Sequence, residues 1–150
     1  MAQAVQRHVT LMFILDTNHL VELGHQSDRG IRLIRRLGES SENSATSIVS
    51  VEEQLRGWMA ELHKTRNPHD QIRLYLKLHE RIDFFSSWMV LDWDAEAADL
   101  FLGFRRQGIR VGTQDLKIAC ITIAHHATLL TRNLADFRLV PGLRVENWLD

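Results

Sequence analysis

Apolar and polar residues alternate along the chain in blocks that predict strands separated by helices. Residues 10–15 form an almost continuous apolar run, which is typical of a strand covered on both faces in a parallel sheet. We expect further strands at 44–50, 88–93 and 128–131, and a fifth near 143–148. Between these segments, apolar residues recur every three or four positions, which predicts intervening helices.

Helix boundaries carry their own signals. Asn67 can cap a helix with Pro68 at its first position, and that helix is expected to run to about residue 85. Asp92 and Asp94 form an Asp-x-Asp pair, but Asp94 lies before a helical pattern and is interpreted as a cap. Gly112 precedes the last long amphipathic segment.

Strands that alternate with helices predict an α/β fold, because right-handed crossovers align the strands in parallel and place helices on both faces. With 150 residues, we expect one domain over residues 9–150, preceded by a loose lead-in at 1–8. Apolar residues make up 45% of the chain and charged residues 25%, as in ordinary globular proteins. The net charge of −1 excludes global basicity, so any contact with nucleic acid has to be local.

Composition also bears on the cellular compartment. The longest apolar run is much shorter than the roughly 20 residues that span a bilayer, and no secretion signal is recognisable, so we expect no membrane association. The single Cys120 is interpreted as a small buried hydrophobic residue. The eight histidines lack the spacing of zinc ligands, and we expect them on the surface or in packing roles. These features predict a cytoplasmic protein.

Acidic residues follow several of the predicted strands, and another lies at the start of the helix that precedes the strand at 128–131. Ligands of doubly wound sheets bind at the carboxyl ends of the strands, so these acids are expected to meet at one edge. Carboxylates that lie close together repel one another unless a cation compensates. The acids are Asp16, Glu52, Glu53, Asp115 and Asp136.

Hard oxygen ligands suit Mg²⁺ or Mn²⁺, which bind carboxylates, retained waters and substrate phosphate. An acidic cluster that holds such ions can activate water and clamp a phosphodiester, so the pattern predicts metal-dependent phosphodiester hydrolysis. Thr17 and Asn18 have short polar side chains that can hold the Asp16 carboxylate or a metal-bound water, and Thr131 lies on the matching edge of another strand. Arg132 is the arginine expected to approach the substrate.

Three segments of the chain resemble, in order and spacing, the motifs of PIN-domain ribonucleases, in particular the toxins of VapBC toxin–antitoxin pairs. They are FILDTNHLVE, SIVSVEEQLRG and VGTQDLKIACITIAHHATLLTRNLADFRLVPGLRVENW. The likeness covers nearly all of residues 11–149 and is most specific in the C-terminal third. It implies a PIN-like three-layer α/β/α sandwich with a mainly parallel sheet of four or five strands.

The resemblance also implies a function. Proteins of this family cleave RNA, often tRNA or ribosomal RNA, with Mg²⁺, and a cognate antitoxin bound near the site inhibits them. A homodimer is common among them, and exposed apolar residues around 55–85 are suited to that arrangement.

Site residues follow from the same resemblance. Asp16 and Asp115 correspond to the two principal metal ligands. Glu53 corresponds to a supporting acid because it lies four residues before Gly57, as in the family's Glu-x-x-x-Gly pattern, and Glu52 is the reserve candidate.

The last acidic position departs from the pattern. Asn133 stands where some relatives carry an acid, so the fourth acidic site rests on Asp136. A catalytically weak or inactive PIN-like binding module is therefore an alternative. An aspartyl-nucleophile phosphatase is a weaker one, because Asn18 occupies the place of the second acid that such enzymes need.

Overall fold

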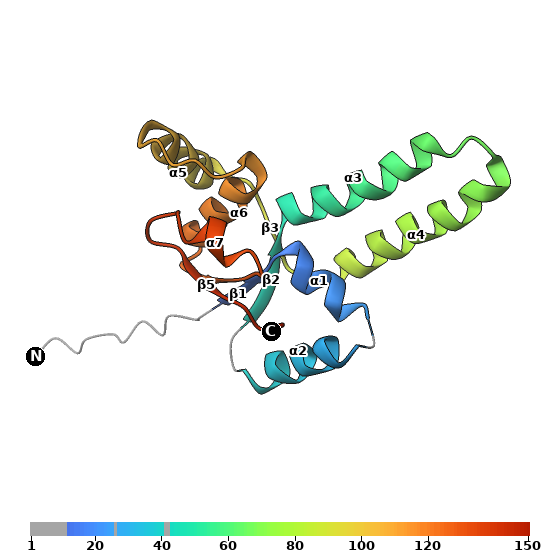
Figure 1. Cartoon of the computed structure of the whole chain (residues 1–150), viewed down its shortest axis with the longest axis horizontal. Helices are drawn as coiled ribbons and strands as arrows, with labels where there is room; N and C mark the ends of the chain where they lie inside the picture. Colours follow the sequence, from blue (N-terminus) through green and yellow to red (C-terminus); the bar gives the residue numbers. More distant parts are fainter. Residues whose placement is uncertain (1–11, 26, 41–42) are drawn as a thin grey trace, which may run out of the picture.

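Five parallel strands form one sheet in the part of the chain that the structure describes, with the order β3-β2-β1-β4-β5 (Figure 1). The structure is a computed structural model that describes residues 12–25, 27–40 and 43–150. The predicted lead-in at 1–8 lies outside the described residues, as do the first residues of the predicted strand at 10–15. The strands are Met12–Leu15 (β1), Asn43–Ser47 (β2), Val90–Leu91 (β3), Thr128–Leu130 (β4) and Arg144–Glu146 (β5).

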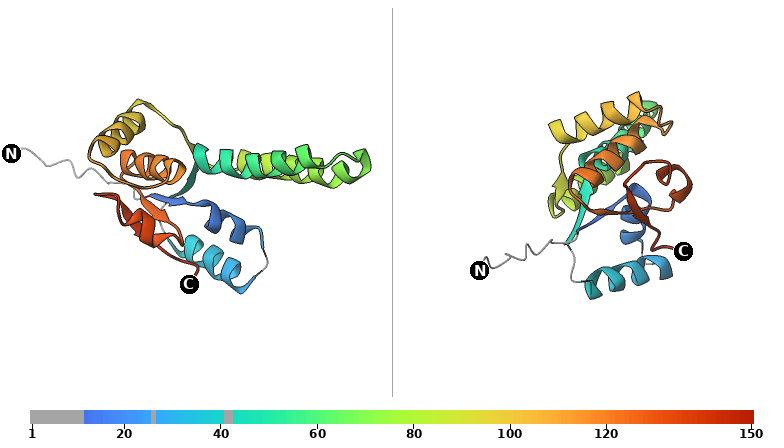
Figure 2. Two further views of the ribbon diagram at one scale, coloured as in Figure 1. Left: turned by 45° about the horizontal axis from the view of Figure 1, so that its top comes forward. Right: turned by 90° about the vertical axis from the view of Figure 1, so that its left-hand side faces the viewer.

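Helices lie on both sides of this sheet, with α1 and α2 on one side and α5 and α6 on the other (Figure 2). Helices α3 and α4 pair with each other and form a hairpin that projects away from the sheet (Figures 1 and 2). The helices are Thr17–Leu23 (α1), Asp28–Glu39 (α2), Ile48–Lys64 (α3), Pro68–Ser86 (α4), Ala95–Arg106 (α5), Thr113–Ala124 (α6) and Leu134–Phe137 (α7).

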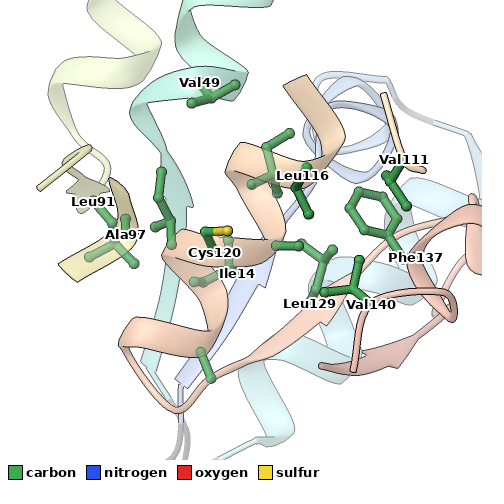
Figure 3. Close-up of a cluster of buried hydrophobic side chains, with 14 of the residues drawn as sticks. Ile14, Val49, Leu91, Ala97, Val111, Leu116, Cys120, Leu129, Phe137 and Val140 are labelled. Carbon is green, nitrogen blue, oxygen red and sulfur yellow. The ribbon is translucent and has the colours of Figure 1, made fainter. Parts of the chain in front are cut away.

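Strand β1 is apolar throughout because its side chains enter two different cores. Ile14 packs in one core with the α6 residue Cys120, and Figure 3 shows the two side chains close together. Phe13 and Leu15 belong to the other core, which includes Leu20 of α1. The predicted α/β sandwich with a parallel sheet is therefore confirmed, and so is the buried position of Cys120.

The predicted helix caps are also confirmed. Asn67 accepts a hydrogen bond from the His69 backbone N–H at 2.9 Å, and Asp94 accepts one from Ala97 N–H at 2.9 Å. One boundary was predicted wrongly: the strand expected at 44–50 ends at Ser47. The Ser47 hydroxyl caps α3 by accepting from the Ser50 backbone N–H, so the helix begins earlier than the apolar pattern indicates.

Several apolar residues that predicted helices remain exposed to solvent. Ile31 and Ile34 of α2 are 49% and 54% exposed, whereas Leu33 is buried. The α3–α4 hairpin exposes a similar set, and the predicted homodimer would use these residues: Met59, Ile72, Tyr75, Leu76 and Ile82. None of the described helices is long and apolar enough to cross a membrane.

Candidate active site

Asp16 lies at the carboxyl end of β1, where the strand gives way to α1. Its backbone N–H donates to the Leu130 carbonyl at 2.9 Å, which extends the pairing of β1 with β4. The side chain is only 6% exposed. Its Oδ1 accepts from the Thr17 backbone N–H at 2.8 Å and its Oδ2 from the Thr131 hydroxyl at 2.9 Å. Two of the predicted supporting residues therefore hold this carboxylate in place.

Glu53 joins Asp16 through Thr17. The Thr17 hydroxyl donates to Glu53 Oε2 at 3.0 Å and links the start of α1 to α3. Glu52 makes different contacts, because its carboxylate accepts from Gln114 Nε2 at 2.6 Å and from Arg56 Nη2 at 3.0 Å. Of the two candidate acids on α3, the geometry places Glu53 beside Asp16.

Asp115 and Asp136 are joined by Asn133. The Asn133 amide Nδ2 donates to Asp115 Oδ2 at 3.2 Å and to Asp136 Oδ2 at 3.1 Å. The backbone N–H of Asn133 donates to the Thr131 hydroxyl at 3.1 Å, and that hydroxyl in turn binds Asp16. Asn133, which departs from the family pattern, therefore holds two acids in place without adding negative charge.

The four acids, hereafter the acidic cluster, are Asp16, Glu53, Asp115 and Asp136. Burial is the main cause that raises the pKa of Asp16, of Glu53 and of Asp115. The Asp16 charge raises the pKa of Glu53 and of Asp115 further, and Asp136 adds to the effect on Asp115. Glu52 behaves in the opposite way, because its hydrogen bond from Gln114 lowers its pKa. The cluster thus concentrates negative charge in a partly desolvated place.

The chemistry of this donor set fits a hard divalent cation, which would relieve the repulsion that raises these pKa values. Among the described residues, no group of three His, Cys, Asp or Glu side chains is arranged to coordinate a metal ion. Mg²⁺ characteristically binds through one or two carboxylates and keeps several waters, so a pair of direct protein ligands is enough. Asp16 and Asp115 are the residues proposed to hold it.

Arg132 was predicted to approach the substrate, and its position is now defined. Its backbone N–H donates to Asn18 Oδ1 at 3.3 Å, which fixes the loop after β4 to α1. Its guanidinium donates from Nε and Nη2 to the Asp150 carboxylate, both at 3.1 Å, and Arg29 lies 3.4 Å from the same carboxylate. The guanidinium is thus paired with Asp150, and contact with substrate stays a prediction.

His19 is a buried residue that sequence reasoning did not single out. Its Nδ1 lies 2.8 Å from Asn18 Oδ1, and its Nε2 accepts from the Trp148 backbone N–H at 3.2 Å. An amide oxygen and a backbone N–H together select the neutral ring with the proton on Nδ1. Burial, followed by the charge of Arg132, lowers the pKa of His19 to about 4. Asn18 therefore holds His19 and the β4 loop, which are not the contacts predicted for it.

No family model matches the chain, but known proteins resemble it in sequence and in fold. The chain is 27% identical to ribonuclease VapC2 of Rickettsia felis over 139 residues, covering 92% of this chain and 98% of that protein. It is 29% identical to the tRNA(fMet)-specific endonuclease VapC of Salmonella typhimurium over 142 residues, covering 92% and 98%.

A solved structure agrees with these relatives. A chain in the crystal structure of DNA-bound VapBC from Salmonella typhimurium superposes with a TM-score of 0.66 at 26% identity, covering 92% of this chain and 98% of that one. Both comparisons extend over nearly the whole of each protein, so the likeness concerns the complete fold. The predicted resemblance to the VapC-type PIN-domain ribonucleases is therefore confirmed both in sequence and in fold.

Proposed function

We propose that this protein is a metal-dependent endoribonuclease and the toxin component of a toxin–antitoxin pair. The observation that carries the proposal is the acidic cluster, in which acids from β1, α3, α6 and α7 gather at the strand ends and burial raises the pKa of Asp16, of Glu53 and of Asp115. The relatives named above as a ribonuclease and as a tRNA-specific endonuclease support the same reaction.

Asp16 and Asp115 would hold Mg²⁺ or, in its place, Mn²⁺ as a second hard cation, and Glu53 and Asp136 complete the cluster. When bound, such an ion supplies water activation and charge stabilisation at a phosphodiester. The hydroxyls of Thr17 and Thr131 fix the orientation of Glu53 and Asp16 through the hydrogen bonds described above.

Glu53 has the properties of a proton acceptor in this reaction. Burial and the neighbouring Asp16 charge raise its pKa, so its carboxylate is a stronger base than that of an ordinary glutamate. Its Oε2 accepts from the Thr17 hydroxyl, and this bond fixes the direction of the group. We assign to Glu53 the removal of the proton from the attacking water. The water oxygen forms a bond to phosphorus while the bond from phosphorus to the leaving ribose oxygen breaks, and that oxygen takes up a proton as the two RNA ends separate.

Substrate and partner follow from the relatives. RNA of the tRNA or ribosomal class is the proposed substrate, in keeping with the tRNA(fMet)-specific endonuclease among the relatives. A cognate antitoxin is the proposed protein partner, since the solved neighbour is a VapBC assembly. We propose a cytoplasmic location, and a homodimer formed through the exposed apolar residues of the α3–α4 hairpin.

The test is RNA cleavage by the purified protein and by the Asp16→Asn variant, with Mg²⁺ and total cellular RNA. We expect discrete new RNA ends, mapped by sequencing, with the wild-type protein and none with the variant, while circular dichroism shows the same fold. Glu52→Gln is the matched control, because Glu52 is a neighbouring acid paired with Gln114 and Arg56, and it should cleave normally.

Two outcomes contradict the proposal in different ways. Equal cleavage by wild-type protein and Asp16→Asn would show that the activity does not come from the acidic cluster. No cleavage by either protein, combined with tight binding of the co-expressed antitoxin, would establish a noncatalytic binding module. In cells, expression of the wild-type protein alone should arrest growth, and expression of Asp16→Asn should not.

A further inference from the structure

A basic cavity of about 400 Å³ lies between α1, α3 and α4. Three of its seven lining residues are basic and none is acidic. The residues are Val21, Gly24, His25, Gln54, Trp58, Lys77 and Arg81. None of the roles assigned to the acidic cluster uses this cavity.

Arg81 is the central cation of the basic cavity. Its guanidinium lies 5.1 Å from the centre of the Phe84 ring and, among the described residues, forms no ion pair. Lys77 is different, because its ammonium group lies 3.3 Å from the exposed Glu80 carboxylate. The planar donor array of Arg81 is therefore free to bind an anion, and guanidinium groups suit phosphate in particular.

Gln54 provides a second, independent sign that a polar ligand belongs here. Its Oε1 and Nε2 are both buried and have no hydrogen-bond partner in the described part of the chain. Buried amides are nearly always hydrogen-bonded, so a group of this kind is expected to meet a ligand or solvent. An amide offers both donors and an acceptor, which matches the mixed polar groups of a nucleotide.

The basic cavity is connected to the acidic cluster along α3. A second cavity of about 280 Å³ shares Gln54 and Trp58 with the first and is also lined by two acids, Glu53 and Glu61. Gly57 forms part of the same wall, and a Cβ atom placed there would meet nothing within 4 Å. A chain-like ligand can thus extend from the acidic cluster, across Trp58, to Arg81.

We propose that the basic cavity binds a backbone phosphate of the substrate RNA, beside the phosphodiester that is cut, with an adjacent base against the Trp58 ring. A basic lining next to a half-buried aromatic ring with one accessible face in the cavity is a combination suited to single-stranded nucleic acid. The proposal rests on the ribonuclease function and adds to it the site that positions the flanking nucleotide.

The experiment measures binding rather than cleavage, in the Asp16→Asn background, with a fluorescent single-stranded RNA of mixed sequence. Arg81→Gln should weaken binding about tenfold at low salt, because a charge-assisted contact to phosphate is lost. The slope of log K against log salt should fall by about 0.7, the value for one phosphate contact on a single strand. Arg73→Gln is the matched control, since Arg73 is exposed on the same helix and lines neither cavity.

The Trp58→Leu variant measures the contribution of base stacking to RNA binding separately from the contribution of the Arg81 charge. Loss of the ring should weaken RNA binding about tenfold through lost stacking, without changing the slope against salt. Unfolding curves of each variant show whether α3 and α4 still pack. In the active background, Arg81→Gln should raise KM and leave kcat nearly unchanged, because the contact acts on binding of the flanking phosphate.

Two results would overturn the proposal. One is equal affinity and salt slope for Arg81→Gln and Arg73→Gln. The other is normal RNA binding by Arg81→Gln with weakened binding of the antitoxin, which would assign the basic cavity to the protein partner. Failure of the ribonuclease function is a separate result, because it shows as cleavage by Asp16→Asn at the wild-type rate.

Discussion

Asp16 of the acidic cluster and His19 are two buried ionisable groups at opposite ends of the first turn of α1, and their surroundings differ in kind. Both ring nitrogens of His19 have partners that suit the neutral ring, one from Asn18 and one from Trp148. Asp16 has hydrogen-bond donors for both oxygens, yet its other neighbours in the cluster are acids. Burial favours the neutral form at both places.

This contrast distinguishes a structural centre from a functional one in this fold. His19 gains hydrogen bonds in the protonation state that burial prefers, so it needs nothing further and connects α1 with the segment after β5. The acidic cluster retains a conflict, because burial and mutual repulsion act on groups that must ionise to bind a cation. Clustered acids whose pKa is raised by burial and by one another are typical of functional sites.

The largest expected effect concerns His19 in acid. Its pKa falls from the ordinary 6.5 to about 4 on folding, so the neutral ring stabilises the fold fully above pH 6.5 and this contribution is lost as pH falls towards 4. The loss is on the order of 3 kcal/mol. Urea unfolding measures this loss. The wild-type protein should have a higher free energy of unfolding than His19→Asn at pH 7.5, and the difference between the two proteins should shrink as the pH falls to 4. NMR titration of the ring near pH 6.5 would contradict the assignment.

The next effect distinguishes Glu53 from Glu52. Glu53→Gln should lower the rate of RNA cleavage about 100-fold, the lower end of the range expected when a general base is removed. Glu52→Gln should leave the rate within about twofold and change stability by under ~1 kcal/mol, since its partners are exposed. Initial rates at saturating RNA decide the point. If both variants lost the same fraction of the cleavage rate, Glu53 in the acidic cluster would have no role that Glu52, paired with Gln114 and Arg56, lacks.

Much of the fold could be predicted from local patterns along the chain. The apolar run of β1 requires burial on both faces, and the caps Asn67 and Asp94 act on backbone groups within three residues, so sequence alone locates them. The end of β2 was predicted wrongly because Ser47 and Ser50 favour a helix start that an apolar pattern cannot reveal. The exposed residues of α2 show the same limit, since spacing predicts a helix but not which face meets the core.

For the candidate site, the sequence indicated which strand ends carry acidic residues. Side-chain directions could not be predicted, because they depend on partners far away in the sequence. Gln114 draws Glu52 away from the cluster, and Asp150 draws the guanidinium of Arg132 to the side of α2. The bridging role of Asn133 required the positions of Asp115 and Asp136 together. His19 gave no sequence signal, since a single histidine after Asn18 has no characteristic spacing.

Thr131→Val gives a smaller effect that tests how Asp16 is held. The fully buried hydroxyl donates to Asp16 Oδ2 and accepts from the Asn133 backbone N–H, and valine keeps the shape without either bond. Buried groups left without partners cost about 1–3 kcal/mol, so the unfolding free energy should fall by that amount. Thr17→Val, at the more exposed hydroxyl, is the comparison and should cost less. An unchanged unfolding free energy for Thr131→Val would mean that these bonds are not needed.

The smallest effect is a pH dependence of stability that has the opposite direction at Asp115 and at His19. Burial and the charges of Asp16 and Asp136 raise the pKa of Asp115. At a pH below the ordinary pKa of an aspartate, the Asp115 side chain is protonated and does not destabilise the fold. Stability is lost as pH rises through the raised pKa, which is opposite to the behaviour of His19. In chelator, Asp115→Asn should therefore become more stable than the wild-type protein between pH 4 and 7, by up to about 1 kcal/mol after solvent screening.

Added Mg²⁺ should reverse this order, because a cation that binds only the folded wild-type cluster stabilises it by mass action. Thermal unfolding at pH 7, with and without Mg²⁺, measures both signs on the same two proteins. If Asp115→Asn were less stable than the wild-type protein at every pH in chelator, the Asn133 amide would already neutralise the repulsion. The acidic cluster would then resemble the satisfied His19 centre, and the physical reason to expect a cation there would be lost.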